Sequence, residues 1–309
     1  MARAFRFGVS ISGVGMDGAG WRDAARKAED LGFDTFLVAD HLRQGFQPMV
    51  ALAAVAEATS SIRLGTFVIN NDFRHPVLLA REAATLDVLS GGRFELGIGA
   101  GHSGDEYREA GIPFDAARVR VERLGESVRL MKQLWSEGRV DFAGNHYTVS
   151  GHESFPKPAQ AAIPVLVGGN GRDLLTLAAT EADIVGFTGF WVGEDGRGRD
   201  FPHFTAASIA NRVELVRTAA GAGFAELELN VLVQGVETRK PRETAEMWAE
   251  ELGVSPEEMA GSPFVLFGSE SEIEEKLISY RERFGFSYIV TFGPGMDALA
   301  PVVARLRGT

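Results

Sequence analysis

Two hydrophobic patterns alternate along the chain. Short apolar runs, typical of buried β-strands, are each followed by a longer segment in which apolar residues recur every three or four positions, as on one face of a helix. The runs predict strands at 5–11, 35–38, 62–69, 94–98, 164–167, 183–187, 227–233 and 288–292. The longer segments predict helices at 21–31, 48–59, 76–89, 119–135, 173–181, 206–220, 273–284 and 298–306.

Eight strand and helix units in strict alternation predict a parallel sheet. Eight units without a break in composition favour closure into a (β/α)8 TIM barrel, so we expect one domain over residues 1–309. The alternative is an open doubly wound sheet, which the same alternation permits.

Three connections between these elements are longer than ordinary loops, at 101–117, 138–162 and 188–205, and a further helix is predicted at 242–252. The first and third follow strands directly, which places them on the catalytic face of a barrel. The third carries Phe190, Trp191, Phe201 and Phe204. We interpret it as a lid that excludes water, with a satellite aromatic cluster as the alternative.

Composition excludes several classes of function. A net charge of -11 disfavours nucleic acid and anionic membranes as partners, and the chain contains no cysteine and only six histidines, so we expect no metal site. No apolar stretch is long enough to cross a membrane, and the N-terminal residues lack the pattern of a signal peptide. We therefore expect a cytoplasmic protein.

The spacing G-x-G-x-x-G occurs at Gly99, Gly101 and Gly104, directly after a predicted strand. It does not predict a dinucleotide site, because Gly111 and Pro113 interrupt the following helix, and the residues about 20 positions later fall in a helical pattern. Gly97, Gly99 and Gly101 alternate with Ile98 and Ala100, so one face of the strand end has no side chains. A flat ring or a neighbouring backbone can lie against that face, and the alternative is a tight corner of the barrel.

Polar or glycine residues follow four of the predicted strands. They are Asp40 and His41, then Asn70 and Asn71, then His102, and finally Gly168, Gly169, Asn170 and Gly171. This distribution is typical of an active site at the carboxyl ends of barrel strands. The last group opens a helix beside Arg172, and backbone N–H groups in such a place bind phosphate.

Several of these segments resemble the bacterial luciferase-like family of flavin and deazaflavin oxidoreductases, especially its coenzyme F-420-dependent branch. The resemblance is carried by LGFDTFLVADHL, by the block from Ser60 to Gly101, by DEYREAGIPFDAARVRVERLGESVRLMKQLW and by PVLVGGNGRDLL. It covers most of the chain and is weakest over residues 188–262. It implies a barrel that holds an isoalloxazine-like ring across the carboxyl ends of its strands.

The resemblance also implies roles for individual residues. Asp40 and His41 match a catalytic Asp-His pair. His102 stands where some relatives carry a glutamate acid and many others a tryptophan, so the glutamate chemistry does not carry over. We predict that His102 donates a proton, stacks on the ring or shapes the pocket. The family's third strand ends in a bulge, often with a non-proline cis peptide, which corresponds here to Phe67, Val68, Ile69 and Asn70. The predicted cofactor contacts are Asp40, Val68, Ile69, Asn70, Gly99, Gly101, His102, Gly168, Gly169, Asn170 and Gly171.

These observations lead to three functional hypotheses. The first is an enzyme that uses coenzyme F-420, a deazaflavin, to move a hydride to or from a small organic substrate. The second is an FMN-dependent monooxygenase, and the third is a flavin-binding protein without catalysis. We also expect a homodimer, from family resemblance and the alanine-rich run at 49–58, and we expect Asp105 and Glu106 to cap a short helix.

Overall fold

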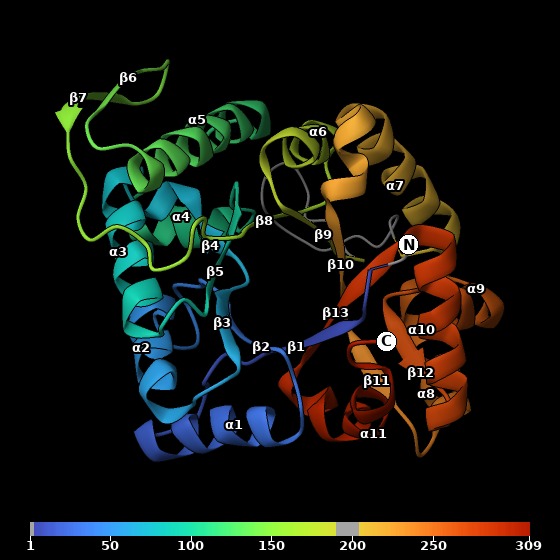
Figure 1. Ribbon diagram of the computed structural model, residues 1–309. Helices are drawn as coiled ribbons and strands as arrows, with labels where there is room; N and C mark the ends of the chain where they lie inside the picture. Colours follow the sequence, from blue (N-terminus) through green and yellow to red (C-terminus); the bar gives the residue numbers. More distant parts are fainter. Residues whose placement is uncertain (1–2, 190–203) are drawn as a thin grey trace.

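Eight parallel strand positions close into a barrel in the computed structural model, which describes residues 3–189 and 204–309 (Figure 1). In chain order the strands are β1 (Arg6–Ser10), β2 (Thr35–Val38), β3 (Arg63–Thr66) continued by β4 (Ile69–Asn70), β5 (Phe94–Gly99), β8 (Val165–Gly168), β9 (Ile184–Phe187), β10 (Glu228–Val233) and β13 (Phe286–Phe292). The sheet is closed because β3 pairs with both β2 and β5. The predicted TIM barrel is confirmed.

Helices surround this barrel as an outer ring (Figure 1). They are α1 (Gly18–Asp30), α2 (Pro48–Ala58), α3 (Pro76–Leu89), α5 (Ala117–Ser136), α6 (Arg172–Glu181), α7 (Ala206–Ala220), α10 (Glu270–Phe284) and α11 (Met296–Leu306). Helices α3 and α7 have the predicted bounds, and the others differ from prediction by a few residues at their ends.

The third strand position departs from its prediction. The continuous run expected at 62–69 is divided into β3 and β4, and the Phe67–Val68 peptide between them is cis. Both residues pack against the apolar cluster inside the barrel. Gly97 on β5 makes room for this break, because a Cβ there would lie 2.0 Å from the Thr66 carbonyl oxygen.

Additional elements occupy the long connections. Helix α4 (Gly104–Ala110) follows β5, and the antiparallel strands β6 (Val140–Ala143) and β7 (Thr148–His152) follow α5. Strands β11 (Gly235–Glu237) and β12 (Val265–Phe267) accompany helices α8 (Pro241–Leu252) and α9 (Pro256–Gly261). Phe190, Trp191 and Phe201 of the predicted lid lie outside the described residues, whereas Phe204 is buried against Phe264.

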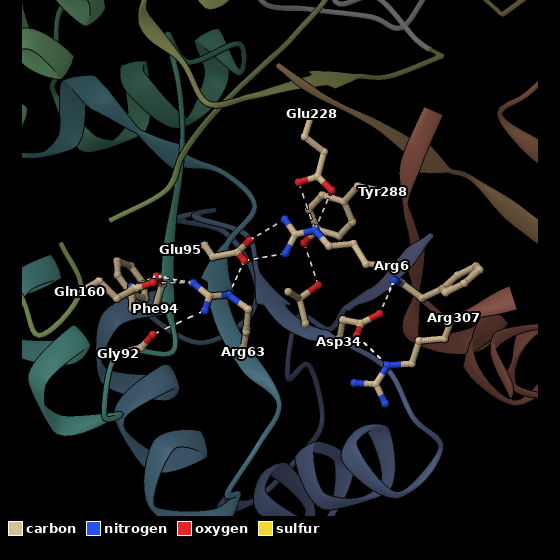
Figure 2. Close-up of polar contacts among 12 residues, drawn as sticks. Arg6, Asp34, Arg63, Gly92, Phe94, Glu95, Gln160, Glu228, Tyr288 and Arg307 are labelled. Carbon is tan, nitrogen blue, oxygen red and sulfur yellow. Dashed lines mark hydrogen bonds and ion pairs between the residues drawn. The ribbon is translucent and has the colours of Figure 1, made fainter. Parts of the chain in front are cut away.

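A network of charged side chains closes the amino end of the barrel (Figure 2). Arg6 donates to Glu95 at 2.6 Å and to Glu228 at 2.9 Å, and Arg63 donates to the same Glu95. The Arg6 guanidinium also lies 3.8 Å from the Tyr288 ring centre. Burial alone would raise the pKa of Glu95, but Arg6 and Arg63 hold it below its usual value. The network links strands β1, β3, β5, β10 and β13.

Candidate active site

The predicted site residues come together at the opposite, carboxyl end of the barrel. They follow or end strands β2, β4, β5 and β8, and parallel strands of one barrel have their carboxyl ends on the same face. The contacts between these residues divide the site into three parts, which are a histidine cluster, a glycine platform and a loop that opens α6.

Two histidines and one carboxylate form the histidine cluster. The His41 Nδ1 lies 2.9 Å from Glu106 Oε1, and the rings of His41 and His102 are 5.6 Å apart and nearly perpendicular. The Glu106 side chain is 7% exposed, whereas that of His41 is 30% exposed. His41 is therefore anchored on one side and open to a ligand on another.

Glu106 corrects one expectation. We expected it to cap the short helix, and it does lie in the first turn of α4, but its carboxylate instead lies 2.9 Å from His41 Nδ1 and accepts the Leu42 backbone N–H at 3.4 Å. The carboxylate beside His41 thus comes from α4 and is not that of Asp40.

The Asp40 carboxylate binds a backbone N–H group and the side chain of an arginine. It forms a two-point ion pair with Arg74, with distances of 2.5 and 3.3 Å, and accepts the Asn70 N–H at 3.2 Å. Asp40 is buried, so these bonds fix the carboxyl end of β4 relative to the loop after β2. Its predicted catalytic role stays a prediction, and its observed contacts are those of a residue that shapes the site.

The glycine platform consists of Val68, Gly99, Gly101 and Gly168. A Cβ on Gly99 would lie 3.0 Å from Val68 Cγ2 and 3.5 Å from the Gly168 carbonyl oxygen, so these three residues adjoin. Ile69 belongs to the main core, so its side chain packs between the strands and the surrounding helices and not inside the barrel. At Gly97 the backbone of Thr66 lies against the glycine face, which confirms one of the predicted alternatives there. Contact of a ring with the platform stays a prediction.

Gly101 is required by close packing beneath it. Its φ is +77°, and a Cβ there would lie 2.0 Å from the Tyr107 hydroxyl and 2.7 Å from Asn70 Oδ1. The hydroxyl donates to Asn70 Oδ1 at 2.8 Å. From α5, Arg120 donates to the carbonyl oxygens of Ala100 and Gly101. The end of β5 is thus held from two sides without a side chain of its own.

The loop of Gly168, Gly169, Asn170 and Gly171 opens helix α6. Gly169 has a φ of +154°, and Gly171 is the N-cap, so it offers the first-turn N–H groups no side-chain acceptor. Phosphate oxygens would supply that acceptor. From α7, Arg212 donates to Asn170 Oδ1 and, at 2.9 Å, to the Thr188 carbonyl oxygen. The residues of this loop therefore fit a phosphate-bearing cofactor.

Arg212 carries positive charge close to this loop. It is buried, and burial lowers the pKa of its guanidinium to about 10, so it remains charged at neutral pH. Sequence reasoning missed Arg212, Arg74 and Tyr107 because their partners belong to other strand and helix units. A helical pattern with an arginine on its buried face was the one available signal.

The described residues hold neither a metal cluster nor a membrane-spanning helix. Within residues 3–189 and 204–309, no group of three or more histidine or acidic side chains is arranged to hold a metal ion. The helices of those same residues include none with the length and apolar character needed to span a bilayer.

Known proteins share both sequence and fold with this chain. The F420-dependent glucose-6-phosphate dehydrogenase of Intrasporangium calvum is 37% identical over 188 residues, covering 58% of this chain and 54% of that protein. The matched stretch thus spans about half the length of that relative. A protein of the same name from Nakamurella multipartita is 28% identical over 323 residues, covering 94% and 91%.

Solved structures and a family model extend these similarities. An F420-dependent secondary alcohol dehydrogenase in complex with an F420-acetone adduct superposes with a TM-score of 0.79 at 19% identity, over 98% of this chain and 99% of its own. At that identity the likeness establishes the fold alone. The sequence model for luciferase-like monooxygenases matches residues 5–287. The chain therefore belongs to the luciferase-like monooxygenase family.

Proposed function

We propose that the chain is an oxidoreductase that binds coenzyme F-420 at the carboxyl end of its barrel and transfers a hydride to or from a small organic substrate. The observation that carries the proposal is the anchored His41 beside His102, which directly follows Gly101 of the glycine platform. The names of the curated relatives support a deazaflavin as the cofactor.

Each part of the site has its own task in this proposal. When bound, the deazaflavin supplies a carbon that accepts or donates a hydride. The Gly168–Gly171 loop, with Arg212 behind it, would hold the cofactor phosphate, and Val68, Gly99 and Gly101 would support the ring. His41 would move the proton that accompanies the hydride, and His102 would border the substrate.

A fluorescence titration of the purified protein with coenzyme F-420 and with FMN tests this proposal. We expect F-420 to bind at least about 10-fold more tightly than FMN, a difference of about 1.4 kcal/mol. Preference for FMN would overturn the proposal in favour of a monooxygenase. Binding of neither would overturn the assignment of the phosphate loop itself.

We also propose that the protein is a homodimer that pairs through α2 and α3. Large apolar side chains are exposed on these helices and on a neighbouring loop, namely Val50, Leu78, Val88, Leu89 and Phe155. Helices α2 and α3 pack side by side, and Leu78 and Phe155 line one groove. Exposed apolar side chains that share a groove, as Leu78 and Phe155 do, commonly mark a protein interface.

Light scattering of two matched variants tests the dimer. Leu78 on α3 is 56% exposed, and Met247 on α8 is 58% exposed. We expect Leu78→Glu to lower the measured mass to that of one chain, whereas Met247→Glu leaves a dimer. A monomeric wild-type protein, or an unchanged mass for Leu78→Glu, would contradict the proposed interface.

A further inference from the structure

We propose that Glu106 positions His41 for proton transfer by keeping a proton on Nδ1, so that Nε2 is the nitrogen that exchanges a proton with the substrate. This inference deepens the proposed function and rests on it for the chemical step. Glu106 is 65 residues from His41 along the chain and belongs to a different strand and helix unit.

Each carboxylate oxygen of Glu106 contacts a different polar group. Its Oε1 lies 2.9 Å from His41 Nδ1, and its Oε2 accepts the Leu42 N–H at 3.4 Å. Because the carboxylate binds both the ring and the backbone of the next residue, it fixes the imidazole relative to its own main chain. The carboxylate is buried, so water competes little for these bonds.

The chemistry of the pair then determines the tautomer. An ionised carboxylate has no proton to donate, so the 2.9 Å contact requires the hydrogen to be on His41 Nδ1. In the neutral ring Nε2 carries the lone pair, and in the charged ring Nε2 carries the second proton. Proton exchange at Nε2 therefore leaves the bond to Glu106 intact.

The other charged groups around the pair are engaged with one another. Arg43 binds Glu109 and lies 3.8 Å from Asp105, both on α4, and Arg74 pairs with Asp40. His102 meets His41 ring to ring. Glu106 is the acidic residue whose bond to His41 the structure defines, so it is the residue to change.

Nuclear magnetic resonance of the 15N-histidine-labelled protein tests the tautomer without cofactor or substrate. The six histidines can be assigned by single substitutions, with His41→Asn identifying the resonance of interest. We expect neutral His41 in the wild-type protein to carry its proton on Nδ1, and Glu106→Gln to give a mixture with the Nε2–H form. The same tautomer fraction in wild type and Glu106→Gln would overturn the proposal.

A matched control is available on the same helix. Glu109 is an exposed glutamate of α4 that pairs with Arg43, so Glu109→Gln makes an identical chemical change without touching His41. We expect the His41 resonances of Glu109→Gln to match the wild type. An equal change in both variants would show a general effect of altering α4 and would overturn a specific role for Glu106.

Kinetics with coenzyme F-420 supply a second readout. We expect Glu106→Gln to lower kcat by about 100-fold, as for carboxylates that orient a catalytic histidine, while the Kd for F-420 changes by less than about twofold. Glu106→Asp, which keeps the charge, should restore part of the activity. Equal losses in kcat for both Glu106 variants and Glu109→Gln would contradict the positioning role.

The two readouts separate this inference from the proposed function. A tautomer shift in Glu106→Gln, together with no F-420 binding by the wild type, would defeat the proposed function and support the role of Glu106. F-420 turnover by the wild type without any tautomer shift in the variant would defeat the role of Glu106 alone.

Discussion

The two ends of the barrel use charged side chains in different ways. At the amino end, Arg6, Arg63, Glu95 and Glu228 come from the strands themselves and pair with one another across the barrel (Figure 2). At the carboxyl end, the partners of the site residues come mainly from helices and loops outside the barrel. The amino end thus stabilises the barrel, whereas the carboxyl end can be adjusted by moving or replacing its surrounding elements.

Among substitutions that test this difference between the two ends, we expect the largest loss of stability at Glu95. Glu95→Gln removes the carboxylate that holds two guanidiniums, so we expect the free energy of unfolding to fall by about 3 to 5 kcal/mol. Urea denaturation measures it. Glu228→Gln, which removes a partner of Arg6 alone, should cost less, because burial already disfavours the ionised Glu228 carboxylate and raises its pKa. Equal losses for the two variants would contradict the central place of Glu95.

Substitution of Gly101, at the carboxyl end, should give the next largest loss of stability. Gly101 and Gly111 both have positive φ, but a Cβ meets the Tyr107 hydroxyl at Gly101 and nothing within 4 Å at Gly111. We expect Gly111→Ala to cost about 1 kcal/mol for its backbone alone and Gly101→Ala about 3 kcal/mol, because Tyr107 must also move. Thermal or urea unfolding of both variants measures the difference, and equal costs would exclude the packing explanation.

A smaller effect is expected for ligand binding when Asp40 is changed. Asp40→Asn weakens the ion pair with Arg74 and the bond from the Asn70 N–H, so the end of β4 loses part of its support. We expect the Kd for coenzyme F-420 to rise about 10-fold, equivalent to 1.4 kcal/mol. The fluorescence titration measures it, with Glu82→Gln, a more distant neighbour of Arg74 at 3.8 Å, as control. Identical affinities for Asp40→Asn and wild type would contradict this role.

The smallest expected effects are changes in the pH dependence of stability. The pKa of Glu95 is lowered in the folded protein, so its stabilisation is present above the usual value of 4.5 and is lost as pH falls below it. Burial raises the pKa of Glu228 despite Arg6, so its contribution has the opposite sign and acts above 4.5.

Urea titrations between pH 6 and pH 3 distinguish the two glutamates. Relative to wild type, Glu95→Gln should lose less stability below about pH 4.5, and Glu228→Gln should lose more as pH falls toward that value. Each change is limited to about 1.4 kcal/mol per pH unit, the slope for one proton. A steeper acid loss in Glu95→Gln would show that its ion pairs do not govern its titration.

Much of the fold could be predicted from sequence, because strands and helices have different apolar periods. The eight units follow from that pattern, and the predicted helix at 206–220 has the bounds of α7. The break between β3 and β4 could not be predicted from the residues alone, because the apolar run at 62–69 is continuous. Only the family resemblance indicated a bulge there.

The site was predicted less completely, for a physical reason. Residues at strand ends, such as His41 and Gly168, lie at fixed places in any barrel, so their sequence positions indicate their location. Glu106 and Arg212 act from helices, and whether a helical side chain reaches a strand end depends on how that helix packs. The local sequence pattern of a helix does not predict how that helix packs against the barrel.

The support of Gly101 by Arg120 and Tyr107 has a consequence for how this enzyme family can diversify. At Gly101 the platform is main chain, and the groups that hold it lie on α4 and α5. Substitutions in the loops around the mouth of the barrel can therefore change the shape of the opening while the platform beneath it persists. Members of the family can therefore differ in their loops and still share this part of the barrel.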